Sequence, residues 1–554
     1  MTQAPPAAPM TGGLTEPPLA AAAGGGRWWW PACLPLLLLA GLPSARFLLF
    51  AANQDAGWLE RITPFLALLM ALAVGRGDAT RRWLMPGILS LAGWPWVLLF
   101  AAVARLPLWW AGEVVAAAEW LPRRALRLLR CPPAPAQPWA GPTRTAVLWG
   151  LLLAALAANA AVFLNSREAA IIGIDGQWYL QASESLLARG TFEAKHPLVT
   201  DGRPAPSRAT RMPGYPLFLA GARLAAGRHQ VRLAAALQSL ANAAAVLLLV
   251  AIGQAVGGPA AGVVAGILFL LYPPLHLGAP RLLTESPAVP LHLLTIYLLL
   301  RAYRTGAGRW WAAAGAMAAV VTLIRPNAFL SPFLVALTVA WWARREGRGW
   351  RALRGPAVML GAFLLLMAPW WVRNALLFHR FVPLTTLGGF HAWGGNDPRT
   401  FGLHTDHHYR EATRVLRQCG GNEVAADREM ARWAREALRA NLRRPPALAR
   451  LCRAKLERLV LEPESESLNR WVVLLHRFVL AAALVGALFL WRSARSAILV
   501  AFAAPILLVH LATYGMEARY LLPLLPLALV WAGTALAWLG GAGGAPEPAP
   551  SRKG

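Results

Sequence analysis

Negative charge is scarce in this sequence of 554 residues, which holds 26 Asp and Glu against 54 Lys and Arg. Lysine is rare as well, because nearly all of the positive charge is arginine. Only 14% of the residues are charged and 57% are hydrophobic, and the apolar residues form long blocks rather than an amphipathic pattern. This composition excludes a soluble enzyme with a large core and predicts a polytopic membrane protein.

The net charge of +28 could indicate a nucleic-acid-binding protein. The arginines, however, flank apolar runs, where positive charge retains loops in the cytoplasm. No tract alternates basic and aromatic residues. We therefore expect no nucleic-acid partner, and we expect membrane lipids around the protein.

Cysteine is also scarce, and none of the four cysteines has the spacing of a metal site. Cys33 and Cys131 lie in the N-terminal quarter of the chain. Cys419 and Cys452 fall in one predicted external loop, where they could pair or remain free thiols.

The apolar blocks predict an all-α fold with about 13–14 transmembrane helices. The N-terminal part contributes candidate spans at 31–50, 62–77, 84–104 and, more weakly, 106–121. The remainder contributes ten, at 144–164, 233–254, 260–274, 286–302, 310–324, 328–343, 355–375, 471–491, 496–514 and 519–539.

Composition also suggests boundaries along the chain. The expected parts are a disordered tail at 1–26, an additional membrane segment with a basic linker at 27–140, a membrane core at 141–375, a helical loop at 376–470, C-terminal transmembrane helices at 471–540 and a disordered tail at 541–554.

Three short loops are strongly basic and are predicted to be cytoplasmic, namely 301–309, 344–354 and 492–495. They agree with one another only if two long segments, 165–232 and 376–470, lie on the opposite, periplasmic side. The second long segment contains two helical patterns, at 422–442 and 445–461, which the breaker "RRPP" separates.

Ionisable residues gather at the external ends of the predicted spans. They are Asp175, Arg208, Arg211, Arg281, Glu285, Arg325, Arg373, Glu517 and Arg519. Cytoplasmic retention does not explain arginine in short external loops. An anionic ligand does, because the planar guanidinium fork suits phosphate.

Simpler explanations apply to each residue taken alone. Asp175 could cap a helix by accepting backbone N–H bonds, and Glu285 could be a helix-start carboxylate. A single arginine could reach lipid headgroups. The sequence "HTDHH" could bind a metal through His404, His407 and His408, with Asp175 as another weak candidate ligand, but no carboxylate or cysteine spacing completes a recognisable site.

The stretch "IDGQWYLQASESLLARGTF", followed by "RMPGYPLFLAGARL", resembles the first external loop of GT-C glycosyltransferases. These polytopic enzymes use a sugar carried on a polyprenyl phosphate. The likeness is to the protein-mannosyltransferase-like group, which includes aminoarabinose transferases of lipid A and Rgt-type galacturonosyl transferases of lipopolysaccharide core. Further similar stretches, among them "RLLTESPAVPLHLL", "LIRPNAFLSPF" and "EARYLLPLLPLAL", extend it over residues 144–539.

The resemblance implies a GT-C-type helical bundle and a set of site residues. Asp175 takes the position of the catalytic acid, Glu285 that of a second acidic residue, and Arg211 that of a basic residue near the lipid phosphate. Some relatives have Asp-Glu where this chain has Asp175-Gly176, which weakens a two-acid or metal mechanism. The residues expected to bind the donor phosphate or substrate are Arg208, Arg211, Tyr215, Arg281, Arg325, Arg373, Asn374, Arg519 and Tyr520.

The expected activity is transfer of a sugar from a polyprenyl-phosphate-linked donor to a lipid, glycan or protein acceptor, by single displacement with inversion. The expected location is a bacterial inner membrane, with the site facing the periplasm. No cofactor is certain, and a divalent metal ion stays open. Two alternatives remain: an O-antigen polymerase or ligase with a diphosphate-linked donor, and a secondary transporter or flippase, although nearly charge-free span interiors disfavour transport.

Overall fold

A computed structural model describes residues 142–203, 205–461, 470–513 and 518–539. The predicted N-terminal spans, both predicted tails, Cys33, Cys131 and Glu517 lie outside these residues. The described part is almost entirely helical, and its one sheet pairs β1 (Ala194–Lys195) with β2 (Pro206–Ser207) antiparallel. The predicted all-α fold is therefore confirmed.

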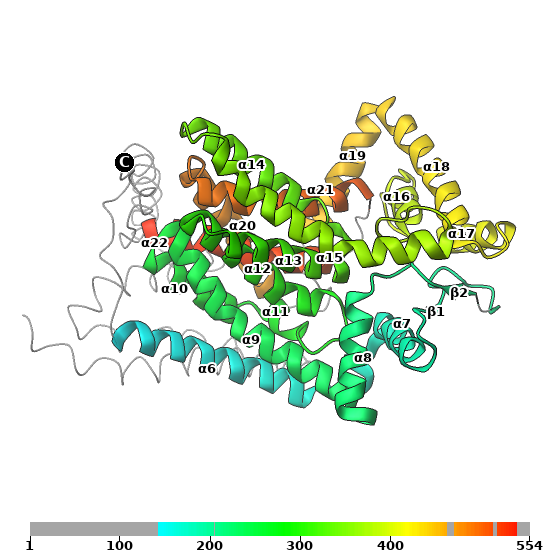
Figure 1. Cartoon of the computed structure of the whole chain (residues 1–554), viewed down its shortest axis with the longest axis horizontal. Coiled ribbons are helices and arrows are strands. Elements are labelled where there is room, and N and C mark those ends of the chain that lie inside the picture. Colours follow the sequence, from blue (N-terminus) through cyan, green and yellow to red (C-terminus); the bar gives the residue numbers. More distant parts are fainter. Residues whose placement is uncertain (1–141, 204, 462–469, 514–517, 540–554) are drawn as a thin grey trace, which may run out of the picture.

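A bundle of apolar helices forms the body of the molecule (Figure 1). Its helices are α6 (Pro142–Asn165), α9 (Gln230–Gly257), α10 (Pro259–Leu270), α12 (Glu285–Thr305), α13 (Gly308–Ile324), α14 (Ser331–Arg345), α15 (Arg354–Phe378), α20 (Arg470–Phe489), α21 (Ala494–Thr513) and α22 (Leu525–Leu539). Each of the ten spans predicted beyond residue 140 coincides with one of these helices. Among the described residues, seven helices are long and apolar enough to cross a membrane, and α10 and α13 are shorter apolar helices.

Short turns with specific chemistry separate these helices. Gly306 has a φ of 68°, in the left-handed region that glycine favours, and it ends α12. Pro326 ends α13, because the residue before a proline is driven out of the helical region. That residue is Arg325, which is extended with φ −132° and ψ 107°. The break therefore leaves Arg325 at the end of its helix.

The basic turns lie together at one end of the bundle. The Tyr303 hydroxyl donates to Glu346 at 3.5 Å, and the Arg348 guanidinium lies 5.8 Å from the Tyr303 ring centre. Arg495 donates to the carbonyl of Ala255 at 2.7 Å. The charge of Arg495 also acts on Tyr303, so the three basic loops share a side, as the sequence predicted.

The two long segments between the spans fold together at the other end (Figure 1). The first contains α7 (Glu168–Arg189), the two strands, α8 (Gly214–Ala226) and a 3-10 turn, η1 (Gly227–His229). The second contains α16 (Gly388–Gly395), α17 (Asp406–Gln418), α18 (Glu423–Leu442), α19 (Pro445–Leu456) and a π-helical turn, η4 (Glu457–Leu461). Short elements complete the described chain: α11 (Pro273–Leu277), η2 (Pro326–Ala328), η3 (Trp350–Leu353) and η5 (Ala518–Leu524).

A shared hydrophobic cluster joins these two segments. Leu198 and Ala205 of the first segment pack with Phe390, Val415 and Met430 of the second. The second segment is called the cap below. Its helices α18 and α19 match the two predicted helical patterns. α18 ends just before the predicted breaker "RRPP", and α19 begins at the first proline of that breaker. Cys419 and Cys452 are free thiols, which decides between the two states that the sequence left open.

Candidate active site

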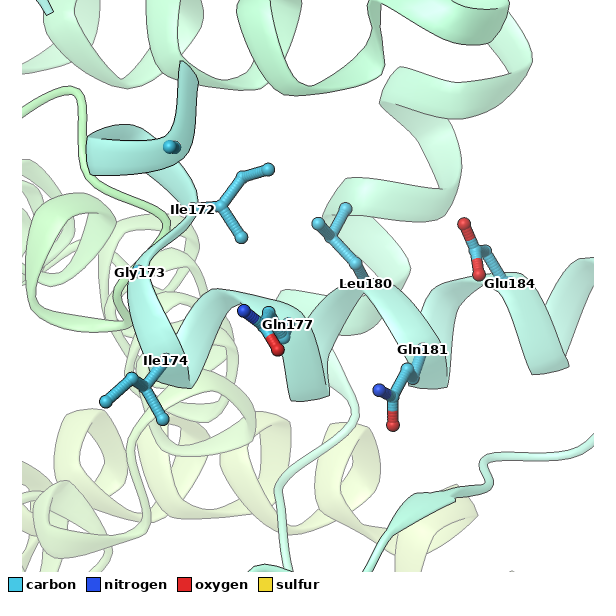
Figure 2. A pocket seen from close by; sticks show the side chains of 8 residues that line it. Ile172, Gly173, Ile174, Gln177, Leu180, Gln181 and Glu184 are labelled. Atoms are coloured by element: carbon cyan, nitrogen blue, oxygen red, sulfur yellow. The ribbon is translucent and has the colours of Figure 1, made fainter. Parts of the chain in front are cut away.

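A backbone break in α7 places Asp175. Gly173, within the helix, has φ 56° and ψ −167°, a conformation that is essentially restricted to glycine. Figure 2 shows the chain changing direction at this residue. Asp175 lies in the first turn after the break, and Tyr179 follows one turn later on the same face. That face is turned inward, since Tyr179 is buried.

The Asp175 carboxylate lies between two arginines from distant parts of the chain. Its Oδ1 lies 3.7 Å from Nη2 of Arg211, which precedes α8. Its Oδ2 accepts a hydrogen bond of 3.1 Å from Nη2 of Arg519, in η5. Each of the three side chains is about a quarter exposed. Asp175 therefore binds two guanidinium groups from distant segments. A carboxylate that only capped its own helix would not make these contacts.

A second, more deeply buried ion pair joins Glu285 and Arg325. The Oε2 of Glu285 lies 2.9 Å from Nη1 of Arg325, and both side chains are less than a tenth exposed. Arg325 also donates to the hydroxyl of Thr284 at 3.0 Å and to the carbonyl of Tyr520 at 3.5 Å. The start of α12 and the end of α13 are thereby tied to η5.

Tyr520 connects the two ion pairs. Its hydroxyl accepts a hydrogen bond of 3.3 Å from Arg519, while its carbonyl accepts one from Arg325. The charge of Arg519 also acts on Glu285. Burial raises the pKa of Tyr179, whose phenol lies within reach of the charges of Arg211, Asp175 and Glu285. Two carboxylates and three guanidinium groups thus share one centre.

Aromatic groups and the cap surround this centre. The Arg211 guanidinium lies 5.0 Å from the ring centre of Trp178, a distance typical of a cation–π contact. His196 and His391, the latter on α16, lie within electrostatic reach of Arg211. Burial lowers the pKa of both imidazoles, to about 4 for His196, so both are neutral at neutral pH. The charge facing Asp175 comes from arginine.

Tyr215 and Arg281 have supporting positions. Tyr215 is fully buried, donates to Gln238 at 2.7 Å and meets the Tyr179 ring edge-on at 4.9 Å. The Arg281 carbonyl accepts hydrogen bonds from Gln238 and Ser286, and its side chain is exposed. Tyr215 lies beneath the site, and the backbone of Arg281 helps to shape the loop before Glu285.

The remaining predicted residues gather at a second centre. Arg373 donates to the carbonyl of Arg208 at 3.0 Å and to the side chain of Asn374 at 2.8 Å. Arg208 pairs with Glu193 at 2.9 Å. Further contacts of these residues are with the rings of Phe192 and Trp370, the carbonyl of Val382 and the cap residue Glu423. In the described part of the chain, none of their hydrogen bonds or ion pairs reaches Asp175.

The histidines of "HTDHH" make contacts within the cap, where the His407 ring centre lies 5.7 Å from that of His408. His408 accepts from the backbone N–H of Thr405 at 3.2 Å and lies 3.4 Å from Asp397. Burial lowers the pKa of His404 to about 3, and its ring packs on Phe390. No metal-binding group of three His, Cys, Asp or Glu occurs within the described ranges. Asp175, flanked by guanidinium groups, also does not fit a cation.

Sequence reasoning missed two residues behind the site. His510 of α21 hydrogen-bonds Asn327 at 2.7 Å and stacks on Tyr520, with 5.5 Å between ring centres and 17° between planes. Asn327 stands in the stretch "LIRPN" that was singled out for Arg325. His510 carried no local signal, because its partners come from two other segments.

An open groove of about 580 Å³ runs along the outer face of α7 (Figure 2). Gln177, Leu180, Gln181 and Glu184 line it, together with the residues around Gly173. Helical spacing puts these side chains opposite Asp175 and Tyr179. The groove is therefore separate from the ion pairs.

The family comparison agrees with the predicted resemblance. Residues 212–372 match the model of the dolichyl-phosphate-mannose-protein mannosyltransferase family. This segment includes Tyr215, Glu285 and Arg325 and begins directly after Arg211. The resemblance to protein-mannosyltransferase-like GT-C enzymes is thereby confirmed. No protein of curated function matches the sequence.

Solved structures also match, at low sequence identity. The archaeal oligosaccharyltransferase AglB of Archaeoglobus fulgidus, solved with an inhibitory peptide and a dolichol-phosphate, is 14% identical over 71% of this chain, with a TM-score of 0.43. ArnT of Cupriavidus metallidurans, solved with undecaprenyl phosphate, is 16% identical over 71% of this chain and 78% of its own, with a TM-score of 0.31. The chain spans half the length of AglB.

Proposed function

We propose that the chain is a membrane glycosyltransferase that takes a sugar from a polyprenyl-phosphate-linked donor. The acceptor would be a lipid, glycan or protein hydroxyl at the external face of a bacterial inner membrane. The single observation that carries this proposal is the position of Asp175, between Arg211 and Arg519. A carboxylate beside two guanidinium groups suits a reaction that moves a proton and releases a phosphate.

Each group would have a defined role in the reaction. The acceptor oxygen forms a bond to the anomeric carbon while the bond from that carbon to the phosphate oxygen breaks. The electron pair of the broken bond goes to the polyprenyl phosphate, and Asp175 takes the proton of the acceptor hydroxyl. Such general base catalysis contributes about 10²–10⁴-fold to the rate.

The arginines would stabilise the phosphate as it leaves. Arg211 contacts Asp175 through Nη2, with an Nη2–Oδ1 separation of 3.7 Å, and about a quarter of its side chain is exposed to an approaching phosphate. Preorganised positive charge often lowers the barrier of such reactions more than any other single effect. One displacement at the anomeric carbon inverts its configuration.

Replacement of Asp175 tests the proposal. We expect Asp175→Asn to lower transfer by about 10²–10⁴-fold, because the amide cannot accept the proton. The measurement is release of undecaprenyl phosphate together with the mass spectrum of envelope glycolipids. Asp201→Asn is the matched control, because Asp201 lies in the same external segment and pairs with Arg417 at the surface.

Full transfer by a folded, inserted Asp175→Asn protein would contradict the proposal. Consumption of a diphosphate-linked donor instead of a monophosphate-linked donor would assign the protein to the polymerase or ligase class.

A further inference from the structure

Glu423 of the cap is a buried carboxylate whose hydrogen bonds leave its own helix. It is the first residue of α18 and is 5% exposed. Its Oε1 accepts from the backbone N–H groups of Arg208 and Ala209, both at 3.1 Å. Its Oε2 accepts from the hydroxyl of Thr386 at 3.2 Å. The cap thus holds the backbone of the first external segment through one carboxylate.

Ordinary helix capping does not account for this arrangement. The side chain of Asn422 already caps α18, because it accepts from the backbone N–H groups of Val424 and Ala425, both at 3.1 Å. A buried carboxylate costs free energy unless hydrogen bonds and nearby charge compensate it. Burial raises the pKa of Glu423 in spite of these hydrogen bonds. The carboxylate therefore binds the backbone at residues 208–209 and does not cap the start of α18.

The opposite side of the same backbone is held as well. Arg373 donates to the carbonyl of Arg208 at 3.0 Å, and the backbone N–H of Thr386 donates to the carbonyl of Ala209 at 3.0 Å. Both N–H groups and both carbonyls of residues 208 and 209 are thereby engaged. This clamp consists of Glu423, Arg373 and Thr386.

The clamp lies next to the proposed phosphate site. Arg211 is two residues beyond Ala209, and two residues span at most about 7 Å of chain. Ala209, Thr210 and Met212 are buried, so the backbone between the clamp and Arg211 has little freedom. A shift of the clamped backbone would move the Arg211 guanidinium relative to Asp175.

We propose that Glu423 is a positioning residue that holds Arg211 in place for the donor phosphate. The inference rests on the proposed function, because it assigns Arg211 to that phosphate. If Glu423 positions Arg211, the cap contributes indirectly to binding of the donor phosphate. In this arrangement a movement of the cap, such as one caused by the acceptor, would change the position of the phosphate-binding arginine.

A double-mutant cycle tests this inference with the full-length protein in nanodiscs and undecaprenyl phosphate as the probe. We expect Arg211→Ala to weaken binding of the probe by about tenfold or more, as for loss of one charge-assisted contact. Glu423→Gln should weaken it by about three- to tenfold in the wild-type background and have no further effect in the Arg211→Ala background. Glu429→Gln, an exposed change on the same helix, is the control.

The outcomes separate the two proposals. Unchanged binding by Arg211→Ala would overturn the phosphate role of Arg211 in the proposed function, and with it the clamp. If Arg211→Ala weakens binding but Glu423→Gln does not, only the clamp is wrong. An equal effect of Glu423→Gln in both backgrounds would show a general structural effect and also overturn the clamp.

A milder pair of variants covers the case in which Glu423→Gln fails to fold. Thr386→Val removes the hydroxyl that donates to Glu423, whereas Thr386→Ser keeps it. We expect the valine variant to weaken binding only when Arg211 is present and the serine variant to bind as the wild type does. Equal binding by both variants would contradict the inference.

Discussion

Burial distinguishes the two ion pairs at the external end of the bundle. Asp175 and its arginines are about a quarter exposed, so a substrate can reach them. Glu285 and Arg325 are less than a tenth exposed and hold each other. These positions agree with the proposed role of Asp175 as the carboxylate that accepts the proton. We propose that Glu285 instead orients Arg325 and Tyr520.

A stability measurement tests this assignment of Glu285. Removal of one partner of a buried ion pair leaves an unpaired charge and typically costs about 3–5 kcal/mol. We expect Glu285→Met to lower the Tm strongly. Glu285→Met combined with Arg325→Met should recover most of the loss, because apolar replacement of both partners is often nearly neutral. Equal Tm values for wild type and Glu285→Met would contradict this expectation.

Asp427 gives the cap a dependence on pH. Burial raises its pKa from 3.8 to about 6, although its Oδ1 accepts from the backbone N–H of Gly389 at 2.6 Å. A carboxyl whose pKa is higher in the folded than in the unfolded protein adds to the free energy of unfolding. This contribution is complete below the unfolded pKa and is lost as the pH rises through about 6. The change is at most about 3 kcal/mol.

Asp427→Asn should therefore reduce the fall in Tm between pH 4 and pH 7, because the amide oxygen still accepts from Gly389 and carries no charge. The measurement is Tm against pH for both proteins. Glu429→Gln, at the surface of the same helix, serves as the control. An unchanged slope in Asp427→Asn would show that this carboxyl does not titrate as described.

Between helices, close packing depends on single glycines. Gly315 of α13 faces α15, where a Cβ would overlap the backbone of Met359. Small residues let helix backbones approach closely in membranes. α13 ends at Arg325, so the packing of α13 on α15 also helps to place the buried ion pair.

Two alanine substitutions test this contact. Gly315→Ala should separate α13 from α15 and cost about 1–3 kcal/mol, as for an overpacked core. Gly361→Ala is the matched control, because Gly361 lies on α15 and a Cβ there meets no atom within 4 Å. The comparison of the two Tm values checks the prediction, and a similar Tm for both variants would contradict it.

The molecule as a whole is polarised from end to end. The basic turns lie at one end of the bundle. Helix α7, which carries Asp175, and the cap helices lie at the other end (Figure 1). Positive charge tends to retain loops in the cytoplasm, and on this basis we propose that the site faces the periplasm.

Thiol labelling in intact cells tests this orientation. Cys452 of the cap is exposed, whereas Gly308 lies in the basic turn at the other end, where a new Cβ would meet open space. With the other cysteines replaced by serine, a membrane-impermeant maleimide should label Cys452. In a second protein, whose single cysteine comes from Gly308→Cys, the maleimide should label that cysteine only after the membrane is permeabilised. Labelling of that cysteine in intact cells would reverse the orientation.

The sequence by itself determined the local elements of this protein. Apolar runs of sufficient length predicted the ten described bundle helices, and the breaker "RRPP" predicted the separation of α18 from α19. These features depend on residues that are close in the chain, because hydrophobic length and proline act locally. The family resemblance pointed to Asp175 for the same reason, through motifs that can be read along the chain.

Only the tertiary structure decided which charges meet. Asp175 and Arg519 are 344 residues apart and form a hydrogen bond, whereas Arg208 and Arg373, which also lie at external ends, contact each other instead. Nothing local distinguishes one external arginine from another. The packing of α7, η5 and the cap determines which arginine contacts Asp175. An ion pair forms only where the fold brings the two charges within a few ångströms of each other.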